Sequence, residues 1–333
     1  MGVLSMPAGD LSLLDNIRYS NGPKGLREYY RSQLRNDRAK ALELINDRNL
    51  RFSTLYLLRG ELYDSVEPAA LNPLYYRALE VAGKLTDKNP KDAEKELRTA
   101  DDSTLSALRW IVRTGYTEID PDENYKRLLE NAAAMLTKTF RDTSALPEIA
   151  EMIFAENRNG GLIHELVWAF FEARSPRSLY LIANYLNSPH IEDVELAKKL
   201  LCFIPDIGSP PGVSGPAVYN RVMYWLQENL PFLYYTGESL HLCNSPRHYT
   251  VSWLAKYLCR PVSAENGEPL LPLNSFEKKL ASGFNKRTEP ARIQLADFSQ
   301  MLHRRNVWQW NTWIRLPADE QARLAARAAG GLL

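Results

Sequence analysis

Cysteine is scarce in this chain, which has 333 residues and only Cys202, Cys243 and Cys259. An odd and sparse set argues against a disulfide framework and is typical of a reducing compartment. Long apolar runs are also missing, because stretches such as 166–171 are far shorter than the roughly 20 residues that span a bilayer. Met1–Leu14 lacks the basic flank of a signal peptide. We therefore expect a cytoplasmic protein without a membrane span.

An excess of charge of one sign is absent too. Lys and Arg number 41 against 40 Asp and Glu, which leaves a net charge of +1. No global attraction to nucleic acid or to an acidic membrane follows from that balance, so any such attraction must be local. The hydrophobic fraction of 45% and the charged fraction of 24% match a folded protein. The length exceeds one compact core and favours either two domains or an elongated repeat array.

The sequence shows no clear run in which apolar and polar residues alternate between hairpin turns, as they do in β-strands. Apolar residues at helical spacing are evident instead. Apolar residues between 71 and 85 follow the three-and-four alternation of one helix face. Asp101 and its neighbours can cap a helix that Gly115 ends, and Asp120-Pro121 can begin the next one. These patterns predict an all-α chain.

One phrase occurs twice. Ile182–Pro189 returns as Leu254–Pro261, each time after Ser-Pro-Arg, in which Ser can cap a helix and Pro can occupy its first turn. Short predicted helices over 145–157, 162–173, 176–187 and 191–203 surround the first copy, and Pro- and Gly-rich loops over 206–216 and 260–274 interrupt the array.

The copies are consistent with two helix-pair repeats of roughly 36 residues each. This portion resembles the HEAT-like class of α-solenoids, and its inward face would be formed by Val194, Ala197, Leu200 and Leu201. The patterns along the chain predict a helical region over 1–142. The resemblance implies HEAT-like antiparallel helix pairs over 143–333, with a C-terminal capping helix.

A basic stripe near the start is the first candidate binding surface. Its members fall on one helix face: Lys24, Arg27, Arg31, Arg35 and Arg38. Guanidinium groups offer rigid donor forks for phosphate or acidic protein. The alternative is a solvated outer face whose cations pair with Glu28, Asp37 and Glu43.

An aromatic cluster near the end is the second candidate. It combines residue types that anchor interfaces and stack on bases: Arg304, Arg305, Trp308, Trp310 and Trp313. The alternative is that Trp310 and Trp313 bury against the preceding repeat and close the helical array.

Histidine and cysteine approach one another in the sequence in one region only. His241, Cys243, His248 and Cys259 include zinc-ligand types, but their spacing lacks the close pairs of zinc modules. No family-specific context identifies any of the cysteines as a nucleophile. We expect packing roles for these residues, with no cofactor and no metal.

The patterns therefore favour a non-catalytic scaffold or adaptor that binds another protein through an extended helical-repeat surface. One alternative is nucleic-acid binding through the basic stripe and the aromatic cluster. Another is an enzyme whose site assembles only in three dimensions, for which Glu165 beside His164 and Glu238 near His241 are available.

Overall fold

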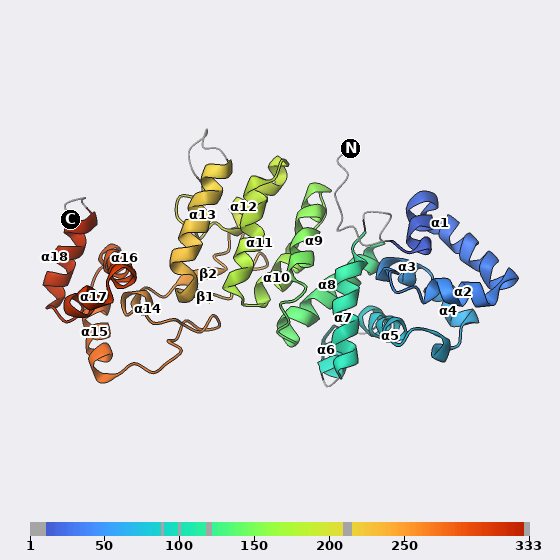
Figure 1. Cartoon of the computed structure of the whole chain (residues 1–333), viewed down its shortest axis with the longest axis horizontal. Helices are drawn as coiled ribbons and strands as arrows, with labels where there is room; N and C mark the ends of the chain where they lie inside the picture. The colour runs from blue at the N-terminus through green and yellow to red at the C-terminus, as the bar shows by residue number, and fades with distance from the viewer. Residues whose placement is uncertain (1–10, 88–89, 99–100, 118–121, 209–214, 330–333) are drawn as a thin grey trace. The chain divides into compact units, whose positions relative to one another are not determined.

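A computed structural model describes residues 11–87, 90–98, 101–117, 122–208 and 215–329 (Figure 1). The protein is predominantly α-helical, with 71% of the described residues in helices. Among the described residues, no helix is both long and apolar enough to cross a membrane. The chain groups by its internal contacts into residues 1–173 (unit 1) and 174–333 (unit 2). The predicted division near residue 142 stays a prediction.

The helices of unit 1 are α1 (Leu13–Asn36), α2 (Arg38–Ile45), α3 (Phe52–Leu57), α4 (Arg59–Ser65), α5 (Pro73–Asp87), α6 (Pro90–Arg98), α7 (Asp102–Gly115), α8 (Glu123–Ala134), α9 (Leu146–Arg158) and α10 (His164–Glu172). The elements of unit 2 are α11 (Leu179–Asn184), α12 (Ile191–Leu200), α13 (Gly215–Asn229), β1 (Leu233–Tyr235), β2 (Tyr249–Val251), α14 (Trp253–Tyr257), α15 (Ser275–Asn285), α16 (Glu289–Arg305), α17 (Val307–Trp313) and α18 (Ala318–Ala329).

The core of unit 1 confirms the helical spacing that the sequence shows over 71–85. In α5, Tyr75, Ala78 and Ala82 are at most 2% exposed, and the helix packs against α7 and α8. Asp101 caps α7 as predicted, because its carboxylate accepts a hydrogen bond from the Thr104 amide. That helix ends at Gly115.

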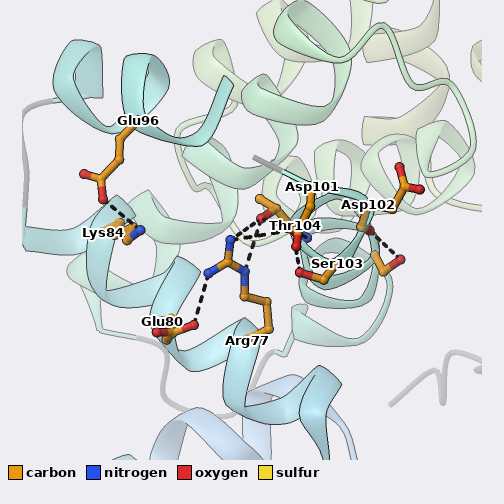
Figure 2. A network of polar contacts seen from close by, with 9 residues as sticks. Arg77, Glu80, Lys84, Glu96, Asp101, Asp102, Ser103 and Thr104 are labelled. Atoms are coloured by element: carbon orange, nitrogen blue, oxygen red, sulfur yellow. Dashed lines mark hydrogen bonds and ion pairs between the residues drawn. The ribbon is translucent and has the colours of Figure 1, made fainter. Parts of the chain in front are cut away.

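Partly exposed polar side chains connect α5 to α6 and to α7 through hydrogen bonds and ion pairs (Figure 2). Arg77 on α5 donates to the Thr104 hydroxyl over 2.6 Å and pairs with Glu80 over 3.1 Å. Lys84, about two turns after Arg77 on α5, pairs with Glu96 on α6 over 2.8 Å. Ion pairs of this exposure add little stability each, so the buried apolar contacts beneath them hold the helices together.

The core of unit 2 forms around α16, which packs against α14, α17 and α18. Apolar and aromatic side chains from these helices and α15 make one buried cluster: Tyr257, Leu258, Phe284, Leu295, Ala296, Trp313, Ile314 and Ala325. Tyr257 stacks on Phe284 with ring centroids 4.7 Å apart, and meets Trp313 edge to face. The predicted C-terminal helix is present as α18, while Gly330 and Gly331 lie outside the described residues.

The all-α prediction is wrong in one detail, because β1 and β2 pair as an antiparallel hairpin with Leu233 opposite Val251. Each strand has only three residues, too few to show an alternation of period two. Ser245-Pro246-Arg247 leads into β2 and not into a helix.

Of two further predictions about helix starts, the one at Ser175 needs correction and the one at Asp120-Pro121 lies outside the described residues. The predicted helix over 176–187 is divided into a 3₁₀ turn, α11 and a second 3₁₀ turn, and the Ser175 side chain makes no capping hydrogen bond. A helix follows Asp120-Pro121 as expected, but those two residues lie outside the described ones, and Asp122 caps α8.

The predicted inward face of the helix after Pro189 is largely buried. Ala197, Leu200 and Leu201 are at most 1% exposed, and Val194 is half-buried. The loop over 260–274 is irregular as predicted, apart from an isolated bridge between Val262 and Pro269. In the other predicted loop, 209–214 lie outside the described residues.

Candidate functional site

An open cavity of about 910 Å³ lies among the helices of unit 2. We call it the apolar groove and define it by its lining residues: Pro205, Tyr224, Trp225, Glu228, Asn229, Trp253, Lys256, Glu289, Pro290, Ile293, Gln294, Asp297, Phe298, Gln300, Met301, Ala325 and Ala328. They come from α13, α14, α16 and α18, with Pro205 from the turn after α12. Ten of these 17 side chains are hydrocarbon, aromatic or thioether, and Tyr224 at the rim is 67% exposed.

The spacing of residues along α16 explains how one helix supplies so much of the lining. Ile293, Asp297 and Met301 follow one another at intervals of four, so they project from the same side of the helix. The opposite side carries Leu295 and Ser299, which are buried in the core. The helix therefore has a core face and a groove face.

The floor of the groove rests on the core of unit 2. Phe298 lines the groove and meets Trp313 edge to face, with ring centroids 5.2 Å apart. Trp313 is only 3% exposed and also contacts Tyr257. Because the floor is backed by packed aromatic rings, we expect the groove to keep its form without an occupant.

A buried lysine stands in the wall. Lys256 is 3% exposed, and its Nζ donates to Asn229 Oδ1 over 2.7 Å and to Asp297 Oδ1 over 2.5 Å. The ammonium also lies 5.4 Å from the centroid of the Trp253 ring. These bonds compensate the buried charge and link α13, α14 and α16.

Two further carboxylates line the groove. Glu228 forms an ion pair with Arg304, and its backbone carbonyl accepts a hydrogen bond from Gln300. Glu289 is exposed in the first turn of α16 and forms no ion pair within the described part of the chain. The lining is thus mostly apolar, and its charged residues are three carboxylates and one lysine.

Most of the basic stripe lies on one helix, because α1 continues from Lys24 to Asn36. The break in α1 at Gly22, whose φ of 70° glycine adopts without strain, comes before the stripe, and only Arg38 belongs to α2. Arg31 pairs with Glu61 on α4 over 2.9 Å, and Arg38 donates to the Ser65 carbonyl over 2.9 Å.

The remaining predicted partners of the stripe differ in their contacts. Lys24 lies 3.9 Å from Glu28 as expected, and Arg27 donates to the Leu57 carbonyl over 3.2 Å. Asp37 instead caps α2, and Glu43 pairs with Lys40. The stripe therefore meets α4, a neighbour that its sequence spacing could not identify.

A second cavity, of about 840 Å³, lies between α1 and α4. We call it the charged groove, with these lining residues: Arg31, Leu34, Arg35, Arg38, Gly60, Glu61, Tyr63, Asp64, Ser65, Val66, Glu67 and Pro68. Three arginines on one side face three carboxylates on the other, which leaves the site without a net charge.

The aromatic cluster divides between surface and core. Trp313 is buried, Trp310 donates from Nε1 to the Ser299 hydroxyl over 2.8 Å, and Trp308 is 76% exposed. Arg304 turns toward Glu228, and Arg305 is exposed.

The expected packing roles fit His248, which is buried, and Cys259, which is half-buried, but His241 and Cys243 are exposed. Burial lowers the pKa of His248 to about 4, and its Nδ1 lies 3.1 Å from the Glu238 carbonyl. Burial raises the pKa of Cys259 to about 11, so this thiol stays protonated at neutral pH and is a poor nucleophile. Among the described residues, no three His, Cys, Asp or Glu side chains form a group that could hold a metal ion.

The sequence patterns missed the apolar groove. Its one local signal is Lys256, a lysine within the apolar repeated phrase at the position where the first copy has Asn184. Comparisons of this chain with known protein families, curated proteins and solved structures give no significant match.

Proposed function

We propose that this protein is a non-catalytic scaffold or adaptor that binds another protein in the apolar groove. The observation that carries the proposal is the lining itself, because aromatic rings, Met301 and aliphatic carbons face an open cavity of about 910 Å³. Apolar surface exposed to water in a concave site is typical of binding surfaces, and aromatic residues and Met are enriched at protein interfaces.

The finer architecture of the proposal is a HEAT-like stacking of helix pairs over 143–333. Within that range, α9 packs against α10, and α11 packs against α12 and α13. Contacts between helices near one another in sequence support a repeat arrangement, which builds extended binding faces without catalytic groups. The cytoplasmic location that the sparse cysteines predict is part of the same proposal.

The contacts of the basic stripe do not favour nucleic-acid binding. A phosphate-binding surface needs cations whose charge is available to the phosphates. Arg31 already pairs with Glu61, which is 8% exposed, and three carboxylates stand across the charged groove. We therefore give the groove of unit 2 priority over the stripe.

Affinity capture from nuclease-treated lysate tests the proposal with two matched variants. Tyr224 at the apolar groove is 67% exposed and Tyr63 at the charged groove is 66% exposed, so Tyr224→Ala and Tyr63→Ala remove equal rings from different sites. We expect Tyr224→Ala to lose a protein that both the parent and Tyr63→Ala retain. Retention by all three chains, or loss of all captured material on nuclease treatment, would contradict the proposal.

A further inference from the structure

The ionisable residues of the apolar groove give it an uncompensated negative charge. Lys256 is neutralised by Asp297, and Glu228 is paired with Arg304. Glu289 then remains without an ion pair in the described part of the chain. The Asp297 side chain is 54% exposed, so its carboxylate can accept a second donor from solvent or from an occupant. Charge complementarity therefore favours a cationic occupant.

The hydrogen-bonding groups that the groove walls offer limit the backbone conformation of that occupant. They are mainly the sides of α13, α14, α16 and α18, whose backbone amides and carbonyls are used inside the helices. A peptide that binds as an added β-strand needs the unpaired edge of a sheet, and these walls offer none. A helix satisfies its backbone hydrogen bonds internally, so it can enter an apolar groove without that cost.

The length of the groove face agrees with a short helix. Ile293 and Met301 are eight residues apart on α16, which corresponds to about 12 Å along the helix axis. A partner helix lying beside this face would meet it over about two turns, a distance that i, i+3, i+4 and i+7 side chains cover.

We infer that the apolar groove binds a basic amphipathic helix of a partner protein. The apolar face of that helix contacts Tyr224, Trp225 and Ile293, and its lysine or arginine side chains contact Glu289 and Asp297. This inference rests on the proposed function and adds the chemical class and conformation of the partner segment.

Two synthetic helical peptides of about 14 residues test the inference, each with Leu at the i, i+3, i+4 and i+7 positions. One carries Lys at the remaining positions and the other carries Glu. Fluorescence anisotropy of the labelled peptides, titrated with the full chain at low and high salt, measures both affinities. We expect the Lys peptide to bind at least about 10-fold more tightly than the Glu peptide, with the difference shrinking as salt rises.

Three variants locate the binding. Glu289→Gln removes an exposed charge and should weaken the Lys peptide by about 2- to 5-fold, in line with an exposed ion pair. Tyr224→Ala should weaken the Lys peptide by about 10-fold, because it removes an aromatic ring at the groove. Tyr63→Ala should change neither affinity, and circular dichroism confirms that each variant keeps its helix content.

Equal affinities for the two peptides, no binding of the Lys peptide, or an effect of Tyr63→Ala as large as that of Tyr224→Ala would overturn the inference. The proposed function fails separately, because it depends on capture of a protein that Tyr224→Ala loses. A captured protein whose groove-contacting segment is acidic or extended would overturn the inference and leave the proposed function standing.

Discussion

The charged groove of unit 1 and the apolar groove of unit 2 have similar volumes, about 840 and 910 Å³, but opposite chemistry. In the charged groove, Arg31 meets Glu61 within the chain, and water can hydrate the exposed remainder. In the apolar groove, side chains such as Ile293 and Phe298 have no polar group to offer water. Under our proposal, the poorly solvated lining of the apolar groove, and not its volume, distinguishes it as the partner-binding site.

The two units also bury a cation in different ways. Arg18 on α1 is 1% exposed and donates to two hydroxyls, Ser53 Oγ and Thr117 Oγ1, each over 2.5 Å. Lys256 in unit 2 has a carboxylate partner, Asp297, at the groove surface. The cation of unit 1 thus joins α1 to α3 and to the segment after α7, whereas that of unit 2 lines the wall of a groove.

The largest expected effect is on the free energy of unfolding, and it distinguishes the buried Trp313 beneath the apolar groove from the exposed Trp308. Trp313→Ala should lower the free energy of unfolding by about 3–5 kcal/mol, because it removes a buried ring that supports Phe298. Trp308→Ala, on the same helix but 76% exposed, should change it by less than about 0.5 kcal/mol. Urea unfolding curves measure both, and equal effects would show that α17 does not support the groove.

The next effect concerns acid stability of unit 2. The folded pKa of His248, about 4, lies below its ordinary value of 6.5, so the unfolded chain binds this proton more readily between these values. Stability is therefore greatest above pH 6.5 and should fall by about 3 kcal/mol as the pH drops to 4. Hydrogen exchange in β1 and β2 measures this decline, which should be shallower in His248→Gln. His241→Gln, an exposed control, should keep it.

Removal of Asp297 should lower the stability of the protein more than removal of Lys256, its partner in the wall of the apolar groove. Asp297→Ala leaves the buried Lys256 ammonium without its carboxylate and should cost about 2 kcal/mol. Lys256→Met leaves a carboxylate that is half exposed and can be hydrated, so it should cost about 1 kcal/mol. Thermal unfolding of both variants gives the order, and a larger loss in Lys256→Met would contradict our account of the wall.

The smallest expected effect on stability concerns Glu130 in unit 1, and its pH dependence is opposite to that of His248. Burial, followed by the charges of Glu165, Glu123 and Glu156, raises the pKa of Glu130 from 4.5 to about 7. A raised folded pKa stabilises the protein in acid, and this contribution is lost as the pH rises from 4.5 to 7. Glu130→Gln should therefore be more stable than the parent at pH 8, by less than about 1 kcal/mol. Equal melting temperatures at pH 8 would contradict this assignment.

Local sequence patterns predicted local structure well. The spacing over 71–85 and the cap at Asp101 anticipated α5 and α7, because both depend on residues within a few positions of one another. The hairpin was missed because each strand has three residues. The apolar groove was missed because its lining comes from four helices spread over more than 100 residues, and no local period reports such contacts.

Photo-crosslinking from the two grooves tests the central claim most directly. A benzoylphenylalanine placed at Tyr224 or at Tyr63 has nearly the same exposure in either position, 67% or 66%, but faces different linings. In nuclease-treated lysate, we predict a discrete protein adduct from position 224 and none of comparable yield from position 63. Equal yields from both positions, or an adduct only from position 63, would contradict the assignment of partner binding to the apolar groove.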